Sequence, residues 1–416
     1  MIAIAEGGDL VLEVAQDESG PQFLYRVDST VLQQQSRYFE NLLSNRFSEG
    51  QALTAATEAL KHTGYPNISD APSELLHRVS IINVGRISKV SSIQVLTADF
   101  LRAVHGRDIS VATPPVANLA NLAVVADRFD ALDCLAKYVR RKKWTQLLDV
   151  KSKGRTAVLQ EERARQKLLI GLLFDHPPWL AKYSKHLILH DSDQWRPGFE
   201  PDETSALWWD IPWGIEEEMI KRREHILETV NSLQLHFFKL YSSGERQCKL
   251  GYDSSLQCDS FQLGEMVRFF SKLGTLRLHS TIYDETEPSY YTGDIDRLIE
   301  SMRPCPSYQI DRNHSHCGLR VRLLPLLDLI QNLLNLESGS LDIGICSDCW
   351  KNKRKIYAWS FANRPVLWVL TGHRALLPSV TSKKGHHRTP SSCLSRHVMV
   401  RDLFMAVGKD WTARDA

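Results

Sequence analysis

The stretch FLYRVDSTVLQQQSRYFENLL, Phe23 to Leu43, changes its apolar period at Asp28 and Ser29. Before this point the apolar side chains alternate with a period of two, which is typical of a strand with one buried face. After it they recur every three or four residues, which is typical of an amphipathic helix, and Asp28 and Ser29 are both residue types that cap helices. The stretch therefore predicts a short strand leading directly into a capped helix whose apolar stripe packs on the sheet.

Two further segments complete the expected sheet. Leu10, Leu12 and Val14 share one face of DLVLEV, and the turn-rich AQDESGPQ separates this run from FLYRV, as in an antiparallel hairpin. HRVSIINV is a third β-rich run. Residues 51–72 hold Gly, Pro, Asn and Ser, so we expect a helix tail and then an irregular insertion there. Residues 1–150 therefore predict an α+β domain, a helical cluster with a small sheet.

The rest of the chain predicts two further domains. Residues 151–244 are mostly helical in pattern, and the longest amphipathic helix starts near Ile215. A loop rich in Pro and Gly precedes it, and its tryptophans are expected to anchor it to neighbouring helices: Trp195, Trp208, Trp209 and Trp213. Residues 245–416 mix Cys, His and short helices, and predict a partly irregular Cys/His-containing domain.

The first domain resembles the BTB/POZ family. Gly8 and Asp9 precede the first strand, and the later helix carries Ala126, Asp127 and Phe129. The helix after the second strand matches the family pattern at Ser29, Val31, Leu32, Ser36, Tyr38, Phe39, Leu42 and Leu43. The long insertion after Glu49 and the C-terminal Cys/His region are similar to those of uncharacterised BTB-containing proteins of filamentous fungi.

The resemblance implies a protein-interaction module or adaptor. Such domains often self-associate, and we expect a homodimer that uses apolar surface of this domain, including the strand Leu10 to Val14 and the helix from Ser29. Some members present substrates to a cullin-type ubiquitin ligase. Those adaptors carry a hydrophobic-x-Glu element after the third strand, whereas this chain has Arg86 and Lys89 and no carboxylate there, which weakens the cullin alternative. Function still depends on the surface, because one fold hosts many functions.

The sharpest chemical signal in the sequence is metal binding. His314 and Cys317 form one chelating pair and Cys346 and Cys349 another, and such pairs suit a tetrahedral, structural Zn²⁺. Cys248 and Cys258 could replace one pair or build a second site, and Cys305 and His316 are also available. The alternative is that these cysteines are ordinary buried residues of a reduced protein.

The charge balance and the sequence motifs bear on nucleic-acid binding and on enzymatic activity. The chain has 51 Lys and Arg against 49 Asp and Glu, so nucleic-acid binding would need a local patch such as Arg140–Lys143, Lys351–Lys355 or Lys383–Arg388. A zinc-containing nucleic-acid-binding regulator is therefore an alternative. No phosphate-loop, dinucleotide, zinc-protease or serine-hydrolase motif is present, and we expect no enzyme.

Hydropathy and the cysteine content bear on location. No segment has the length of apolar sequence that a membrane span requires, and MIAIAEGGDL lacks the basic start of a secretory signal. We therefore expect an intracellular protein, cytoplasmic or nuclear, without a membrane partner. Its 8 Cys are then expected to be reduced or metal-bound.

Overall fold

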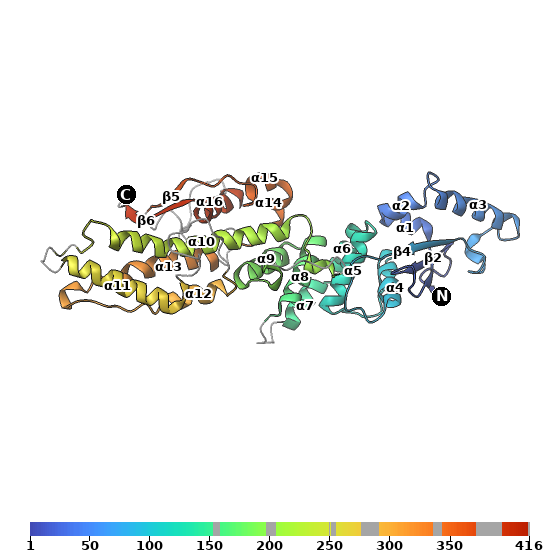
Figure 1. Cartoon of the computed structure of the whole chain (residues 1–416). Coiled ribbons are helices and arrows are strands. Elements are labelled where there is room, and N and C mark those ends of the chain that lie inside the picture. The colour runs from blue at the N-terminus through green and yellow to red at the C-terminus, as the bar shows by residue number, and fades with distance from the viewer. Residues whose placement is uncertain are drawn as a thin grey trace, which may run out of the picture. The chain divides into compact units, whose positions relative to one another are not determined.

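The computed structural model describes residues 1–152, 159–196, 205–248, 250, 255–275, 291–335, 343–371 and 393–414 (Figure 1). The chain divides into two compact units, each of which is described by itself. Unit 1 holds Met1–Tyr183 and Glu200–Trp213, and unit 2 holds Ser184–Phe199 and Gly214–Ala416. Unit 1 is a mixed α/β structure with a small sheet, as expected, and unit 2 is mostly helical.

Unit 1 contains a four-stranded sheet in the order β1-β3-β2-β4. Its strands are β1 (Ile2–Ala3), β2 (Leu10–Ala15), β3 (Phe23–Val27) and β4 (Arg78–Ile82). The predicted hairpin is present, because β2 and β3 pair antiparallel with Leu12 opposite Tyr25, and β4 joins β2 in parallel with Val79 opposite Leu12. The core side of β2 is fully covered, and Leu12 and Tyr25 are buried.

The position of β2 limits how it could take part in self-association. The strand Leu10 to Val14 was expected to contribute to a surface for a second copy of the chain, and because β2 is paired on both sides it has no free edge to offer. Its backbone N–H and C=O groups are therefore already used in the sheet. Among the described residues the sheet edges are β1 and β4, and any pairing of sheets would have to use one of these strands.

The helix predicted after β3 begins where expected but is divided in two. Asp28 is the N-cap of α1 (Ser29–Gln35), and its carboxylate accepts hydrogen bonds from the N–H groups of Thr30 and Val31. Ser36 then adopts an extended conformation and its hydroxyl caps α2 (Arg37–Leu42). The expected burial is confirmed for Leu32 and Phe39. The ring of Phe129 stacks on the ring of Phe39, with their centroids 5.5 Å apart.

Residues 51–72 are less irregular than expected. Helix α3 covers Ser48–His62, and only a short 3₁₀ turn, Ile68–Asp70, and bends follow it. Ala, Leu and Glu favour helix by intrinsic propensity. Only Gly50 and Leu53 of this helix are buried, so the sequence has no apolar stripe from which to predict it.

Helix α4 (Ile93–Val104) packs against the sheet, and the other helices of unit 1 extend the core. They are α5 (Val116–Arg128), α6 (Leu132–Arg141), α7 (Trp144–Ser152), α8 (Glu161–Leu173) and the first half of α9 (Pro177–His190). Gly106 has a φ of +72° just after α4, which is the conformation in which glycine commonly ends a helix. A φ of +44° at Asp130 separates α5 from α6.

The tryptophans of the predicted anchoring loop differ in burial. Trp208, in the short 3₁₀ turn Leu207–Trp209, is fully buried in unit 1, whereas Trp213 is 49% exposed. Arg165 lies over the ring of Trp209 at 5.5 Å from its centroid. In unit 2 the indole N–H of Trp195 donates to the carboxylate of Glu216. The burial of Trp208 thus confirms that it anchors the loop, whereas the exposed Trp213 does not.

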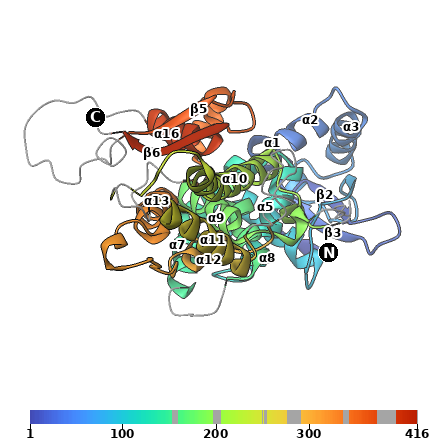
Figure 2. The same cartoon turned by 60° about the vertical axis from the view of Figure 1, so that its left-hand side comes forward.

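Unit 2 is built around the long helix α10 (Ile215–Ser242), which the sequence predicted. Its other elements are α11 (Ser255–Leu273), α12 (Ile295–Met302), α13 (Leu319–Asn335), α14 (Ser347–Asn352), α15 (Arg354–Tyr357), β5 (Leu367–Thr371), α16 (Cys393–Met405) and β6 (Gly408–Arg414). Helix α11 runs beside α10, and the parallel pair β5–β6 lies with α16 (Figure 2). No helix among the described residues combines the length and the hydropathy that crossing a membrane needs.

Candidate metal centres

Unit 2 contains two groups of four side chains that bring metal-ligating atoms together. Centre 1 consists of Cys248, Cys258, His314 and Cys317, and centre 2 consists of Cys346, Cys349, Cys393 and His397. Within each centre the ligand atoms all lie within 4.8 Å of one another. Each centre offers three thiols and one imidazole, which is a set that binds zinc in proteins.

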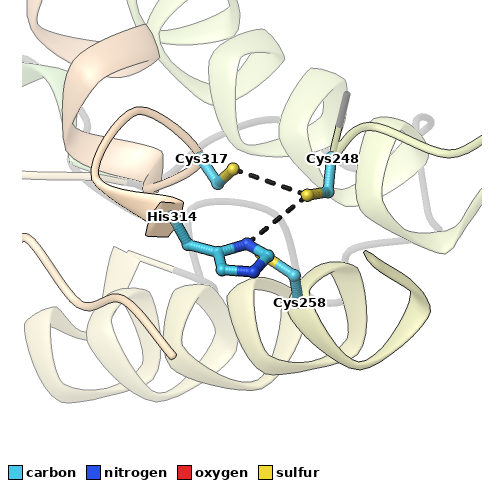
Figure 3. A group of neighbouring side chains, drawn as sticks. All are labelled: Cys248, Cys258, His314 and Cys317. Atoms are coloured by element: carbon cyan, nitrogen blue, oxygen red, sulfur yellow. Dashed lines mark hydrogen bonds between the residues drawn. The ribbon is translucent and has the colours of Figure 1, made fainter. Parts of the chain in front are cut away.

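The four ligands of centre 1 come from three places in the chain. Cys248 follows α10, Cys258 lies in the first turn of α11, and His314 and Cys317 stand in the segment between α12 and α13. Figure 3 shows the thiols of Cys248 and Cys317 pointing toward each other, with the ring of His314 beside them. The Cys248 sulfur is 3.7 Å from the Cys317 sulfur and 3.4 Å from Nδ1 of His314.

Hydrogen bonds hold the backbone of centre 1 in place. The carboxylate of Asp259 accepts from the N–H groups of Gln247 and Cys248, at 2.8 and 3.0 Å. The hydroxyl of Tyr241 donates to the carbonyl of Cys317 at 3.3 Å, and the N–H of Cys317 donates to the carbonyl of His314 at 3.0 Å. These contacts orient the ligands, as the surroundings of metal sites commonly do.

Two short helical segments form centre 2. Cys346 is the N-cap of α14 and Cys349 lies in its first turn. Cys393 and His397 are one helical turn apart on α16, so their side chains share a face of that helix. The Cys393 sulfur is 3.9 Å from each of the other two sulfurs and 3.0 Å from Nε2 of His397.

A buried ionic group connects centre 2 to α10. Glu218 and Arg222 form an ion pair at 2.8 Å and are both almost fully buried. Arg222 also donates to the carbonyls of Ile343 and Gly344, at 2.8 and 3.1 Å. Its guanidinium lies over the ring of Tyr357. The segment that enters the Cys346 turn is therefore fixed from the side of α10.

The sulfur–sulfur distances in both centres match a tetrahedral zinc site, and the sulfur–nitrogen distances are somewhat shorter than it requires. Zn–S bonds of about 2.3 Å and Zn–N bonds of about 2.1 Å place two sulfurs about 3.8 Å apart, and a sulfur and a nitrogen about 3.6 Å apart. The sulfur–sulfur distances are 3.7 Å in centre 1 and 3.9 Å in centre 2. The sulfur–nitrogen distances are 3.4 and 3.0 Å. Each centre can therefore hold one ion with small movements of the side chains.

Burial opposes ionisation of the thiols of centre 1, and a bound cation would offset this effect. Burial, and then the neighbouring charges of Cys317 and Cys248, raise the pKa of Cys258 to about 12. Burial also raises the pKa of Cys317. Burial opposes ionisation of Cys248 as well, but hydrogen bonds, first that of the Leu250 backbone, outweigh it and lower this pKa. A divalent cation removes the repulsion among the thiolates and lets all of them ionise.

Centre 2 shows the same electrostatics. Burial, followed by the charge of Cys346, raises the pKa of both Cys349 and Cys393. Burial, and then the charges of Arg222 and Arg396, lower the pKa of His397 to about 4. The imidazole is therefore neutral at physiological pH, and its lone pair is available to a metal.

The structure divides the four predicted ligands between the two centres. His314 and Cys317 join Cys248 and Cys258, the pair that the sequence analysis left open as a second site, while Cys346 and Cys349 lie in centre 2. The two predicted pairs therefore do not meet in one site. Sequence spacing identifies chelating pairs, but it does not say which pairs the fold brings together.

Cys393 and His397 are the ligands that sequence reasoning missed. Their Cys-x-x-x-His spacing places two donors on one helical face, and this was the available signal. Cys305, the other cysteine that the sequence offered, is buried outside both centres.

A comparison of the chain with family models, with curated proteins and with solved structures finds no match.

Proposed function

We propose that this chain is a non-catalytic, protein-binding protein whose unit 2 is held together by two structural zinc ions. The observation that carries the zinc proposal is that each centre is complete. Three sulfurs and one nitrogen fill a tetrahedral coordination sphere and leave no position for water or substrate. A closed site of this kind stabilises a fold, whereas catalytic zinc sites keep one position open.

The position of the two centres supports a structural role. Centre 1 links the end of α10, the start of α11 and the segment before α13, and centre 2 links α14 to α16. Unit 2 has only the two-stranded sheet β5–β6 among its described residues. Short helices that a sheet does not organise gain most from a cross-link, and metal binding then supplies folding free energy.

Unit 1 is proposed as the binding module, of the BTB/POZ kind. The proposal is supported by the hairpin β2–β3, by the capped helix α1 directly after it, and by the return of β4 beside β2. It is also supported by the sequence pattern at Ser36 and Phe39, because the Ser36 hydroxyl bonds the carbonyl of Phe129 and Phe39 lies in the core. Its partners are proposed to be proteins, among them a second copy of this chain.

Metal analysis tests the zinc part of this proposal. Purified full-length chain, dialysed against metal-free buffer, is expected to retain two zinc ions per chain, measured by inductively coupled plasma mass spectrometry. Cys305→Ser serves as the control, since this buried cysteine lies outside both centres, and it should also retain two. A folded wild-type chain that carries no zinc would refute the proposal.

Light scattering tests self-association. Size-exclusion chromatography of the zinc-loaded full chain is expected to give twice the mass of one chain. Chelation of the zinc should leave that doubled mass unchanged if self-association belongs to unit 1, because both centres lie in unit 2. A single-chain mass at micromolar concentration in the zinc-loaded sample would count against the self-associating module.

One observation favours nucleic-acid binding as a second candidate. Lys351, Lys353 and Lys355, on and between α14 and α15, are exposed, and Phe361 nearby in sequence is 59% exposed. Exposed cations and an aromatic ring can contact phosphates and a base of a single strand. Affinity for a labelled oligonucleotide, measured by anisotropy, should then fall steeply between about 50 and 200 mM salt. No measurable affinity at low salt would exclude this candidate.

A further inference from the structure

The two centres differ in how far solvent reaches their sulfur atoms. In centre 1 Cys248 and Cys258 are buried, with exposed fractions of 3% and 0%, and Cys317 is nearly so at 9%. In centre 2 only Cys349 is buried, while Cys346 and Cys393 are half-buried. Oxidation of cysteine depends on thiolate character and on access. Because bound zinc would keep the thiols of both centres ionised, the two centres differ mainly in how accessible their sulfur atoms are to solvent.

The half-buried pair of centre 2, Cys346 and Cys393, is also placed for a disulfide. The sulfurs of Cys346 and Cys393 are 3.9 Å apart, and a disulfide requires about 2.05 Å. Cys393 is the first residue of α16 and Cys346 is the residue that caps α14. Both therefore stand at helix ends, where a shift of the side chain disturbs few helical hydrogen bonds.

We propose that centre 2 is a site of reversible oxidation, at which peroxide links Cys346 to Cys393 and releases one zinc ion, while centre 1 keeps its metal. This inference rests on the proposed function, because it requires both centres to hold zinc. Centre 2 would then respond to peroxide in addition to stabilising the fold.

The step balances with hydrogen peroxide as the two-electron oxidant. The sulfur of Cys393 attacks one peroxide oxygen, so the O–O bond breaks, hydroxide leaves, and Cys393 becomes a sulfenic acid. The thiolate of Cys346 then attacks that sulfur, the S–S bond forms, and a second hydroxide leaves. Two protons convert the two hydroxides to water. Zinc keeps its charge throughout. It leaves because only one thiolate and one imidazole remain to hold it, and the last thiolate then takes up a proton.

Oxidation of this pair preserves a link between α14 and α16. The zinc ion joins these helices in the reduced state, and the disulfide joins them in the oxidised state. His397 and Cys349 lose their metal partner, yet α16 stays tethered near α14. A thiol reductant together with Zn²⁺ should therefore restore the centre without complete refolding of unit 2.

A zinc-release assay on the full chain tests the inference. The protein is first shown to hold two zinc ions and is then treated with excess hydrogen peroxide in the presence of a colorimetric zinc indicator. One equivalent is expected to appear roughly tenfold faster than the second, because access to the sulfurs limits the reaction. Peptide mapping should find a Cys346–Cys393 disulfide, and reductant with Zn²⁺ should remove it and restore two zinc ions.

Two single-centre variants make the assignment specific. Cys393→Ser should hold one zinc ion that is released only at the slow rate, and Cys258→Ser should hold one that is released at the fast rate. If Cys258→Ser does not fold, the peptide map of the oxidised wild-type chain still distinguishes the centres. Equal release from both centres, a first disulfide within centre 1, or a link through Cys349 would overturn the inference. A chain without zinc at the outset would instead overturn the proposed function.

Discussion

The hydroxyl of Tyr357 accepts a hydrogen bond of 2.8 Å from the backbone N–H of Cys346 and donates one of 3.2 Å to the carbonyl of Gly344. Its ring lies under the guanidinium of Arg222, and the side chain is almost fully buried. One aromatic residue thus connects the cysteine turn of centre 2 to the buried charge on α10. The backbone around Cys346 is therefore held by contacts other than the four side chains of centre 2.

Tyr357→Phe is expected to weaken centre 2 while leaving its four ligands intact. The substitution removes the hydrogen-bond partner of the part-buried N–H of Cys346, which costs about 0.5–1.5 kcal/mol. Loss of such a supporting group typically lowers metal affinity by about 10- to 100-fold. Competition with a chelator of known affinity measures this, and one of the two zinc ions should leave at a lower chelator concentration. Tyr138→Phe in unit 1, which removes a comparable bond to the carbonyl of Arg107, should leave both ions as in the wild type.

Cys258→Ser is expected to remove one zinc ion and to destabilise the neighbouring helices. Serine is a poor ligand for zinc, and the remaining ligands of centre 1 cannot complete its tetrahedral sphere. Metal analysis should give one ion per chain, and amide hydrogen exchange should accelerate in α11. The matched substitution Cys305→Ser changes a buried thiol outside the centres. Retention of two ions by Cys258→Ser would show that Cys258 is not a ligand.

Glu218→Gln is expected to destabilise unit 2. The carboxylate pairs with the buried Arg222 and accepts hydrogen bonds from the N–H groups of Trp359 and Ser360. Its neutralisation leaves the Arg222 charge uncompensated in the interior, which costs about 3–5 kcal/mol. Urea unfolding of the zinc-loaded chain measures the loss. Glu217→Gln changes an exposed carboxylate one residue away and should alter the free energy of unfolding by less than about 0.5 kcal/mol.

The stability of unit 1 is expected to fall as the pH drops below about 6.5, the usual pKa of histidine. His105 accepts a hydrogen bond from the N–H of Asp28 through Nε2, at 3.2 Å, and its Nδ1 lies 2.8 Å from the carbonyl of Leu101. This arrangement fits the neutral ring with its proton on Nδ1. Burial is the main cause that lowers the pKa of His105, and the charge of Arg107 adds to it.

The direction of this pH dependence follows from proton binding in the folded and unfolded states. Below about 6.5 the unfolded chain takes up a proton that folded His105 binds only at lower pH, so stability is lost as the pH falls. Denaturation of the full chain between pH 7.5 and pH 5 should show this slope, and His105→Gln should reduce it. Burial also lowers the pKa values of His77 and His176, so part of the slope should persist. A slope that the substitution leaves unchanged would contradict this assignment.

The local elements of unit 1 were readable from the sequence. The change of apolar period at Asp28 predicted the strand, the cap and the start of the helix, because alternation and helical periodicity follow from backbone geometry alone. The break at Ser36 and the full length of the helix Ser48–His62 were not predicted. The first depends on a hydroxyl that bonds the distant carbonyl of Phe129, and the second has too few buried residues to leave a pattern.

The sequence by itself determined which residue types could bind metal and which of them stand one helical turn apart, since such spacings are properties of the local chain. Only the tertiary structure decided that His314 and Cys317 belong with Cys248 and Cys258, and that Cys346 and Cys349 belong with Cys393 and His397. Each centre joins segments more than 40 residues apart. Their meeting depends on how the helices of unit 2 pack, which no spacing within one segment encodes.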